Sequence, residues 1–233
     1  MLNPPASWPF DVSALLLDMD GTLIDSTPSV ERAWGQFFRE RGSDLTFGHD
    51  MHGIPARGTI RRVFPEYSDA EVEEAHSRVE QLEMDDAGSI EILPGTARIL
   101  AALDEISAEV GRPVWTIVTS CTRPLFEKRW ATTGLPHPAH LVTSDQVERG
   151  KPHPDPFLLG MERLGFSGSD VLAAEDSRGG LTAARDAGAI TLGLSTTTPV
   201  ADLEPLSDAV VTSLDDIDVA LVDGRIRVTR RDQ

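Results

Sequence analysis

Short apolar runs alternate with amphipathic segments over most of the second half of the chain. The runs are mostly apolar and lack the alternation of apolar and polar residues that a half-exposed strand shows. This pattern indicates strands that are buried on both faces of a sheet. The segments between them are about a dozen residues long and carry apolar side chains at helical spacing. This order predicts an α/β fold with a parallel sheet covered on both faces. The predicted strands span residues 14–17, 114–118, 140–143, 171–174 and 190–194.

A stretch of helical character separates the first of these strands from the others. Its first helix is expected to start with Thr27 as the N-cap and to end at Gly42. A loop follows, and then a short helix from Pro55. Ser68 and Glu71 have the spacing of a capping box and predict the start of a third helix. The stretch therefore reads as an all-helical insertion.

The chain is accordingly expected to have two domains. Residues 1–26 and 93–233 would form the α/β core, and residues 27–92 would form a helical cap. Because the insertion leaves directly after the first strand and returns before the second, we expect it to lie over the strand ends as a lid. Near the end of the chain, an Asp-Gly pair within apolar alternation predicts a hairpin over residues 221–228.

Composition and charge exclude several classes of partner. The 233 residues contain 21 Lys and Arg against 38 Asp and Glu, a formal net charge of −17 that disfavours nucleic acid and anionic lipid. An anionic substrate therefore needs a local cation cluster or a metal. No apolar run approaches the length of about 20 residues that a membrane helix needs, and the amino terminus does not resemble a signal peptide. The single cysteine, Cys121, favours a cytoplasmic setting; it has no evident histidine partner and is expected to serve packing.

Two carboxylates, Asp18 and Asp20, directly follow the first predicted strand. The carboxyl ends of strands are where open α/β sheets bind ligands. Gly21 permits a sharp turn, so both carboxylates are expected to converge on one ligand. A solvated turn or a helix cap would show a similar acidic pair. An EF-hand calcium loop is excluded, since it needs glycine at position six and glutamate at position twelve, whereas Gly21 stands at position four and Ser29 at position twelve.

Polar residues also follow three other predicted strands or their connections. Thr119 and Ser120 offer hydroxyl and N–H groups at a strand-to-helix junction, which suit a phosphate oxygen. Lys151, between glycine and proline, is able to reach inward as a point charge. Glu175 and Asp176 form a second acidic pair. Four carboxylates would repel one another without a cation, and carboxylate oxygens are ligands that Mg²⁺ prefers.

Four motifs, in order along the chain, resemble those of the haloacid dehalogenase-like phosphohydrolases. The helical insertion is similar to the cap that one subclass of this superfamily carries between its first and second motifs. Within that subclass the chain looks most like β-phosphoglucomutases and small sugar- or glycerol-phosphate phosphatases. The resemblance implies a Rossmann-like core with a parallel sheet and an inserted α-helical cap domain. The matching segments are Asp18-Met19-Asp20-Gly21-Thr22, Thr119, Lys151-Pro152 and Glu175-Asp176-Ser177.

The resemblance also implies a role for each motif residue. Asp18 would accept the phosphoryl group, and Asp20 would protonate the leaving alcohol and later activate water. Mg²⁺ would be held by an Asp18 oxygen, the Asp20 carbonyl and Asp176, with Glu175 nearby. Thr119 and Lys151 would neutralise phosphoryl oxygens. The other residues expected at the substrate or phosphate are Gly21, Thr22, Ser120, His52 and Arg57.

The cap loop is expected to face the substrate, as in that subclass. Arg57 would either clamp a polar group of the substrate or lie exposed on a cap helix. His49 and His52 lack a third convergent ligand for a transition metal. His137 and His140 lie in a proline-rich loop and are expected to have no chemical role.

The sequence predicts a Mg²⁺-dependent phosphatase that acts on a small phosphorylated metabolite, a sugar or polyol phosphate, through an aspartyl phosphate. A β-phosphoglucomutase-type mutase is the alternative, since it would share that intermediate. A 2-haloacid dehalogenase is disfavoured, because those enzymes lack the second aspartate of the first motif and need no metal. Which metabolite is the substrate, and whether the protein is a monomer or a dimer, stay open.

Overall fold

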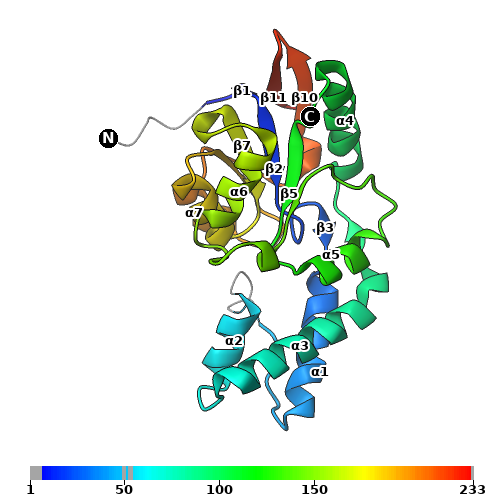
Figure 1. Ribbon diagram of the computed structural model, residues 1–233, viewed down its shortest axis with the longest axis vertical. Helices are drawn as coiled ribbons and strands as arrows, with labels where there is room; N and C mark the ends of the chain where they lie inside the picture. Colours follow the sequence, from blue (N-terminus) through cyan, green and yellow to red (C-terminus); the bar gives the residue numbers. More distant parts are fainter. Residues whose placement is uncertain (1–6, 49–50, 52–54, 232–233) are drawn as a thin grey trace.

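A six-stranded parallel sheet forms the centre of the protein (Figure 1). The computed structural model describes residues 7–48, 51 and 55–231. In the sheet the strands follow the order β6-β5-β2-β7-β8-β9, so that the first long strand of the chain lies between strands from later segments. All neighbouring pairs are parallel, as the sequence predicts. The strands are β2 (Ala14–Leu17), β5 (Trp115–Val118), β6 (Leu141–Val142), β7 (Val171–Glu175), β8 (Ile190–Leu194) and β9 (Ala209–Val211).

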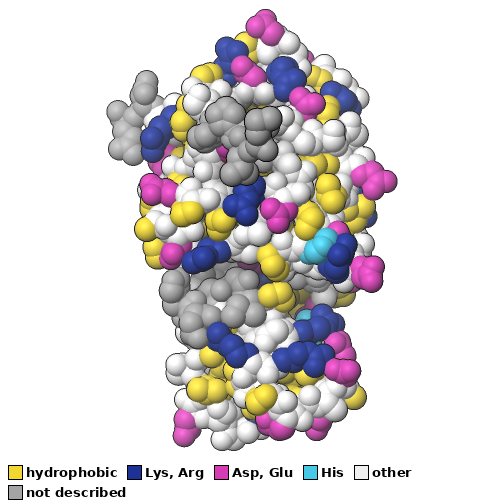
Figure 2. All heavy atoms as spheres, turned by 90° about the vertical axis from the view of Figure 1, so that its left-hand side faces the viewer, with side chains coloured by type: hydrophobic (Ala, Val, Ile, Leu, Met, Phe, Trp, Pro, Cys, Tyr) yellow, Lys and Arg dark blue, Asp and Glu magenta, His cyan; other side chains and the backbone are white. Residues whose placement is uncertain are grey.

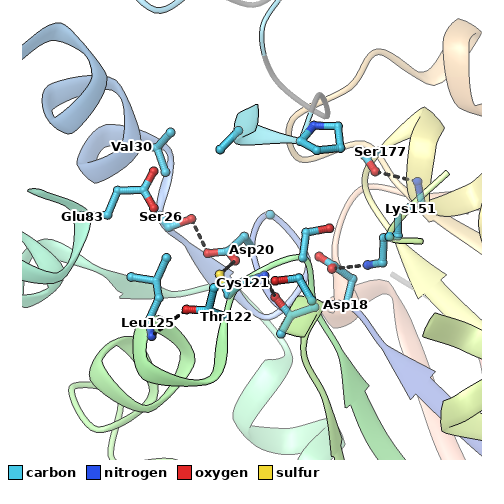
Figure 3. A pocket seen from close by; sticks show the side chains of 18 of the residues that line it. Asp18, Asp20, Ser26, Val30, Glu83, Cys121, Thr122, Leu125, Lys151 and Ser177 are labelled. Atoms are coloured by element: carbon cyan, nitrogen blue, oxygen red, sulfur yellow. Dashed lines mark hydrogen bonds and ion pairs between the residues drawn. The ribbon is translucent and has the colours of Figure 1, made fainter. Parts of the chain in front are cut away.

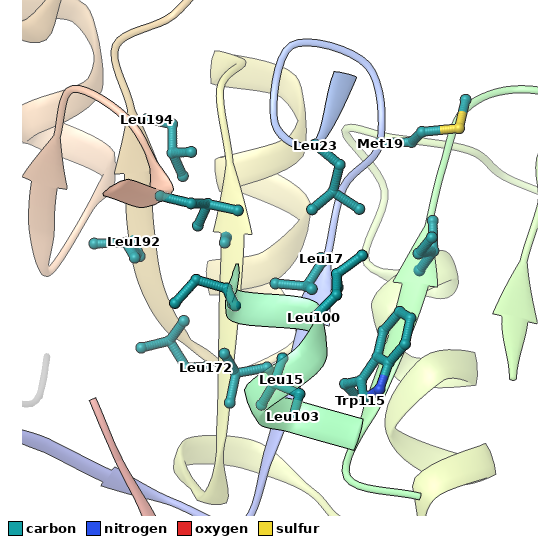
Figure 4. Packing of buried hydrophobic residues seen from close by; sticks show 14 of the residues in the cluster. Leu15, Leu17, Met19, Leu23, Leu100, Leu103, Trp115, Leu172, Leu192 and Leu194 are labelled. Carbon is teal, nitrogen blue, oxygen red and sulfur yellow. The ribbon is translucent and has the colours of Figure 1, made fainter. Parts of the chain in front are cut away.

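Successive side chains of β2 enter two different hydrophobic clusters. Leu15 and Leu17 join the cluster that contains residues of α4 (Thr96–Val110) and α5 (Arg123–Trp130) (Figure 4). Ala14 and Leu16 join the cluster on the other face, with residues of α6 (Asp155–Leu164) and α7 (Arg178–Asp186). The strand is buried on both faces, which explains its unbroken apolar sequence.

A small antiparallel sheet extends the core beside α4. Its strands are β1 (Phe10–Val12), β11 (Arg225–Arg230) and β10 (Ile217–Val222), in that order. Asp223 and Gly224 connect β10 to β11 with φ angles of 51° and 77°, so the hairpin predicted from the Asp-Gly pair is confirmed. Strand β1 was not predicted.

Three helices pack around a hydrophobic cluster of their own, separate from the two clusters at the sheet. They are α1 (Thr27–Glu40), α2 (Ala56–Val63) and α3 (Asp69–Asp85), and we call them the helical cap. The predicted capping box of α3 is present: the Ser68 hydroxyl accepts from the Glu71 N–H, and the Glu71 carboxylate accepts from Ser68. The N-cap of α1 is Ser26 and not Thr27 as predicted. The Thr27 N–H donates a hydrogen bond to the Asp25 carboxylate.

The chain passes from core to cap and back through a two-stranded antiparallel ribbon, which the sequence did not predict. It consists of β3 (Ile24–Asp25) and β4 (Glu91–Ile92), with Ile24 opposite Ile92. Figure 1 shows the cap beyond the end of the parallel sheet at which this ribbon leaves. The division of the chain into domains at these residues stays a prediction.

The remaining short elements lie in connections of the core or at the end of the cap. None of the helices in the described part of the chain is both long and apolar enough to span a membrane. On the face drawn in Figure 2, basic and acidic side chains are interspersed and form no broad patch of one sign. The short elements are η2 (Ala87–Ser89), η3 (Ser144–Gln146), η4 (Gly168–Asp170), α8 (Val200–Leu203), η5 (Glu204–Leu206) and η6 (Leu214–Asp216).

Candidate active site

A cavity of about 710 Å³ lies where the carboxyl ends of the parallel strands meet the helical cap (Figure 3). The core contributes polar side chains to it, and the cap contributes apolar side chains together with Arg57, His76 and two carboxylates of α3. Core residues that line the cavity include Asp18, Asp20, Thr119, Lys151, Glu175 and Asp176. Cap residues that line it include Val30, Trp34, Val79, Glu80 and Glu83.

Asp18 stands at the tip of β2 and is only 6% exposed. Its backbone N–H donates to the Ala174 carbonyl at 3.0 Å, which continues the pairing of β2 with β7 by one residue. The chain then turns at Gly21, which has a φ of 80°. A side chain at this position would overlap the Asp176 carboxylate, so glycine permits both the turn and the close approach of the two loops.

Lys151 connects the ends of three adjacent strands. Its Nζ donates to Asp18 Oδ1 and Glu175 Oε1, both at 2.6 Å, and to the Val118 carbonyl at 2.8 Å. The Lys151 side chain is 7% exposed. Burial acts against its charge, but Asp18 and Glu175 outweigh burial and raise the pKa of Lys151. The lysine that the sequence placed in this site is therefore charged and fixed against Asp18.

Glu175 and Asp176 are held by neighbours from two loops. Glu175 Oε2 accepts from the Ser177 N–H at 2.9 Å and from the Ser177 hydroxyl at 2.8 Å. The Asp176 carboxylate accepts from the Thr197 hydroxyl. Sequence reasoning missed Thr197, although it follows β8 and is therefore near a strand end of the kind that supplied the other residues.

The charges of this group do not balance within the protein. One oxygen from each of Asp18, Glu175 and Asp176 lies within 4.8 Å of the others, and all three residues are buried. Among the described residues, Lys151 pairs with Asp18 and Glu175, so two negative charges remain in excess when all three carboxylates are ionised. Burial, reinforced by the neighbouring carboxylates, raises the pKa of Asp18 to about 7 and that of Asp176 well above its ordinary value. The donors and the missing charge both fit a Mg²⁺ ion.

Asp20 lines the same cavity, but its carboxylate has different partners from that of Asp18. Its Oδ1 accepts from the Ser26 hydroxyl at 2.6 Å and from Arg129 Nη1 at 2.9 Å. Its Oδ2 accepts from the Cys121 thiol at 3.1 Å. In Figure 3 the Asp20 side chain points toward Ser26 and Cys121, apart from the Asp18–Lys151 pair. Burial raises the pKa of Cys121 well above its ordinary value, which argues against a thiolate nucleophile.

Of the other core residues expected at the phosphate, three line the cavity and one does not. Thr119 is 2% exposed and lines the cavity, with its hydroxyl accepting from the Cys121 N–H at 3.1 Å. Ser120 and Gly21 also line the cavity. Thr22 is fully buried and is not among the described residues that line it.

On the cap side, the structure describes only one of the three residues singled out in the sequence. Arg57 lines the cavity, but its guanidinium donates to the Glu73 carboxylate at 2.6 and 2.7 Å. His49 and His52 lie outside the described residues. Neither His137 nor His140 is among the described residues that line the cavity.

Comparison with known proteins agrees with this geometry. A family profile described as haloacid dehalogenase-like hydrolase matches residues 12–188, which include every core residue of the site named above except Thr197. The chain belongs to the haloacid dehalogenase-like hydrolases. The match begins two residues before β2 and ends two residues after α7. It therefore covers the motif strands and the helical cap.

Two relatives in this hydrolase family are similar over most of their length. Hexitol phosphatase A from Escherichia coli (strain K12) is 35% identical over 208 residues, which cover 88% of this chain and 92% of that protein. Glycerol-1-phosphate phosphohydrolase 1 from Saccharomyces cerevisiae is 31% identical over 201 residues, covering 80% and 76%. Among solved structures, a family IA haloacid dehalogenase-like hydrolase from Entamoeba histolytica superposes with a TM-score of 0.78 at 24% identity, covering 89% of this chain and 96% of that one.

Proposed function

We propose that the protein is a Mg²⁺-dependent phosphatase that hydrolyses the phosphate monoester of a sugar or polyol, with Asp18 as the nucleophile. The observation that carries this proposal is the separation of the two aspartates. Asp18 lies against Lys151 within the group that fits a metal, whereas Asp20 is held apart by Ser26 and Arg129. One carboxylate is thus placed to bond to phosphorus and the other to exchange a proton. The names of the relatives supply the substrate class.

The reaction we propose has two steps. In the first, an Asp18 oxygen attacks phosphorus, the bond between phosphorus and the substrate oxygen breaks, and Asp20 gives that oxygen its proton. In the second, Asp20 takes a proton from water as the water oxygen attacks the phosphorus of the aspartyl phosphate. Inorganic phosphate leaves and the Asp18 carboxylate is restored. Lys151 would neutralise charge on the phosphoryl oxygens through both steps, and the hydroxyl of Thr119 would donate a hydrogen bond to one of them.

Mg²⁺ would be held by Asp18, the Asp20 backbone carbonyl and Asp176, with Glu175 as a neighbouring carboxylate. When bound, the ion would stabilise the negative charge of the transferring phosphoryl group. Gly180 supports this arrangement from α7, because a side chain there would overlap the Glu175 carboxylate.

The rest of the cavity suits an uncharged, hydroxyl-rich molecule. The arginines and the lysine that line it within the described part of the chain all have carboxylate partners: Arg57 has Glu73, Arg129 has Asp20 and Glu83, and Lys151 has Asp18 and Glu175. A second phosphate that bound to one of these arginines or to the lysine would therefore have to break an existing ion pair. This disfavours the bisphosphate that a phosphosugar mutase would need. A cytoplasmic setting and a monomeric or dimeric state stay predictions.

A phosphate-release screen tests the proposal. Wild-type protein would be assayed on hexitol, hexose, glycerol and glycolate phosphates and on hexose bisphosphates, with Mg²⁺ and with a chelator. We expect Mg²⁺-dependent release of phosphate from the monophosphates of uncharged sugars or polyols. Glycolate phosphate and the hexose bisphosphates should release little. Interconversion of hexose 1- and 6-phosphates that depends on a bisphosphate, with little phosphate released, would identify a mutase. Inactivity on every ester would contradict a phosphatase.

A further inference from the structure

Arg129, on core helix α5, is buried beside Asp20 and contacts residues of both core and cap. It is 2% exposed, although arginine side chains are almost never this buried unless they are paired. Its Nη1 lies 2.9 Å from Asp20 Oδ1 and 3.0 Å from Cys121 Sγ. Its Nη2 lies 3.2 Å from Glu83 Oε2 on cap helix α3. One guanidinium therefore joins the proton-exchanging aspartate to the cap.

Burying the Glu83 carboxylate in this position costs free energy, because it loses water contacts. Its side chain is 11% exposed. Burial raises the pKa of Glu83 to about 7, with further contributions from Asp20 and Glu80, even though Arg129 opposes the shift. An apolar side chain of α3 would pack in this position without that cost. What Glu83 provides that an apolar residue would not is a hydrogen bond with Arg129.

The guanidinium is planar, so fixing its two ends fixes its orientation. Glu83 holds Nη2, and this directs Nη1 at Asp20 Oδ1. Ser26 bonds the same oxygen from the start of α1. Both contacts tie the Asp20 carboxylate to elements at the edge of the cap.

We propose that Arg129 and Glu83 form a positioning pair that sets the orientation of the Asp20 carboxylate and makes it depend on the seating of the cap. This inference rests on the proposed function, in which Asp20 is the general acid and base. The pair has no described contact with Asp18, Glu175 or Asp176, and Arg129 meets Asp20 at its carboxylate, not at the backbone carbonyl that would bind Mg²⁺. Its loss should therefore impair proton transfer more than substrate binding.

The test compares leaving groups that differ in their need for a proton. Single-turnover rates of alcohol release from a sugar or polyol phosphate would be measured beside nitrophenol release from p-nitrophenyl phosphate, at a pH of about 8, where Glu83 is ionised. The variants are Glu83→Gln, Arg129→Lys and Arg129→Met. Glu40→Gln is the matched control, because Glu40 pairs with Arg78 within the cap and does not line the cavity. Thermal unfolding of each variant identifies any that fail to fold.

We expect Glu83→Gln to slow alcohol release about tenfold, a part of the roughly 10²- to 10⁴-fold that general acid catalysis supplies in full. Nitrophenol release and KM should change less than twofold in the same variant. Arg129→Lys should keep more of the alcohol-release rate than Arg129→Met, because it retains a cation beside Asp20. The Glu40→Gln control should match wild type on both substrates.

Equal slowing of both substrates by Glu83→Gln, or no slowing at all, would overturn the positioning role. Either result would leave the proposed phosphatase activity standing, because that activity is measured on wild-type protein. If Arg129→Met does not fold, Glu83→Gln decides the matter alone, since glutamine keeps the volume of the side chain and leaves the contact between Arg129 and Asp20 possible.

Discussion

Lys151 Nζ and Asp18 Oδ1 lie 2.6 Å apart, and both side chains are less than a tenth exposed. A charge-assisted hydrogen bond of this length holds the carboxylate in one orientation. It also leaves Asp18 with a second oxygen, Oδ2, for which the structure gives no hydrogen bond within the described residues. The pair thus fixes the proposed nucleophile without blocking it. Lys151 is at the same time bound to Glu175, so Asp18, Lys151 and Glu175 form one connected unit.

The acidic group should bind Mg²⁺ and thereby stabilise the fold. By mass action, Mg²⁺ at 100 times its dissociation constant would add about 2.7 kcal/mol to the free energy of unfolding. Asp176→Asn removes a ligand and should lose most of this gain. Asp186→Asn, which changes an exposed carboxylate on α7, should respond as wild type does. Thermal unfolding with Mg²⁺, compared with Na⁺ at equal ionic strength, measures the effect. The same Mg²⁺ shift in Asp176→Asn and wild type would place the ion elsewhere.

Gly180→Ala should disturb the site through Glu175. An added methyl group would overlap the Glu175 carboxylate, and such overpacking typically costs about 1–3 kcal/mol. We expect lower stability together with a large loss of phosphatase activity. Gly88→Ala is the matched control, because a methyl group there meets no atom within 4 Å. Full activity in Gly180→Ala would show that the position of Glu175 is not critical.

The stability of the fold should depend on the protonation of Glu83. Burial raises the pKa of this carboxyl from 4.5 to about 7, while Arg129, Asp20 and Glu80 face it. Between these values the folded state keeps a proton that the unfolded state releases, so the free energy of unfolding falls as pH rises through this window. The contribution is at most on the order of 3 kcal/mol.

Glu83→Gln cannot release that proton. Its stability relative to wild type should therefore increase as the pH is raised from about 5 to about 8. Denaturant unfolding of both proteins at the two pH values measures this difference. In Glu40→Gln the difference from wild type should stay constant, because arginine and glutamine neighbours lower the pKa of Glu40 to about 2. A constant difference for Glu83→Gln as well would mean that its pKa is not raised.

Arg57→Ala separates the two readings of the cap arginine. If Arg57 contacts the substrate, this variant should raise KM for a sugar or polyol phosphate and leave p-nitrophenyl phosphate nearly unaffected. Glu73→Ala breaks the same ion pair from its other end, and an exposed pair contributes only about 0–1 kcal/mol to stability. Glu73→Ala should therefore not raise KM. If Arg57→Ala and Glu73→Ala change KM for both esters equally, Arg57 only forms a surface ion pair with Glu73 and does not contact the substrate.

The long central strands were predictable because their sequences are apolar without interruption. β2, β5, β7 and β8 appear within a residue of their expected positions. The strands β1, β3, β4 and β9, which the sequence did not predict, have only two or three residues, too few to show a period of two. β6 also has two residues and was predicted only as part of a longer segment, 140–143. The stability of these short strands depends on partners far away in the chain, such as β11 for β1. Local pattern carries no information about those partners.

The polar residues of the site divide in a similar way. The motif residues Asp18, Lys151 and Asp176 follow strands or their connections, where position alone suggests a ligand. Arg129 and Glu83 lie within amphipathic helices, where a charged residue normally faces solvent. Their burial arises only when α3 of the cap packs beside α5 of the core. A single sequence does not show that contact.

Trapping the phosphorylated enzyme is the most direct test of the account. Protein would be mixed with Mg²⁺ and a substrate from the phosphate-release screen, quenched with acid during turnover, digested and analysed by mass spectrometry. We expect one phosphoryl group on Asp18 in the wild type, and neither phosphoryl group nor turnover in a folded Asp18→Asn variant. In Asp20→Ala more of the phosphorylated enzyme should accumulate when p-nitrophenyl phosphate, whose leaving group needs no proton, is the substrate. Phosphate release by Asp18→Asn at even a tenth of the wild-type rate, or wild-type turnover with the phosphoryl group on another residue, would contradict Asp18 as the nucleophile.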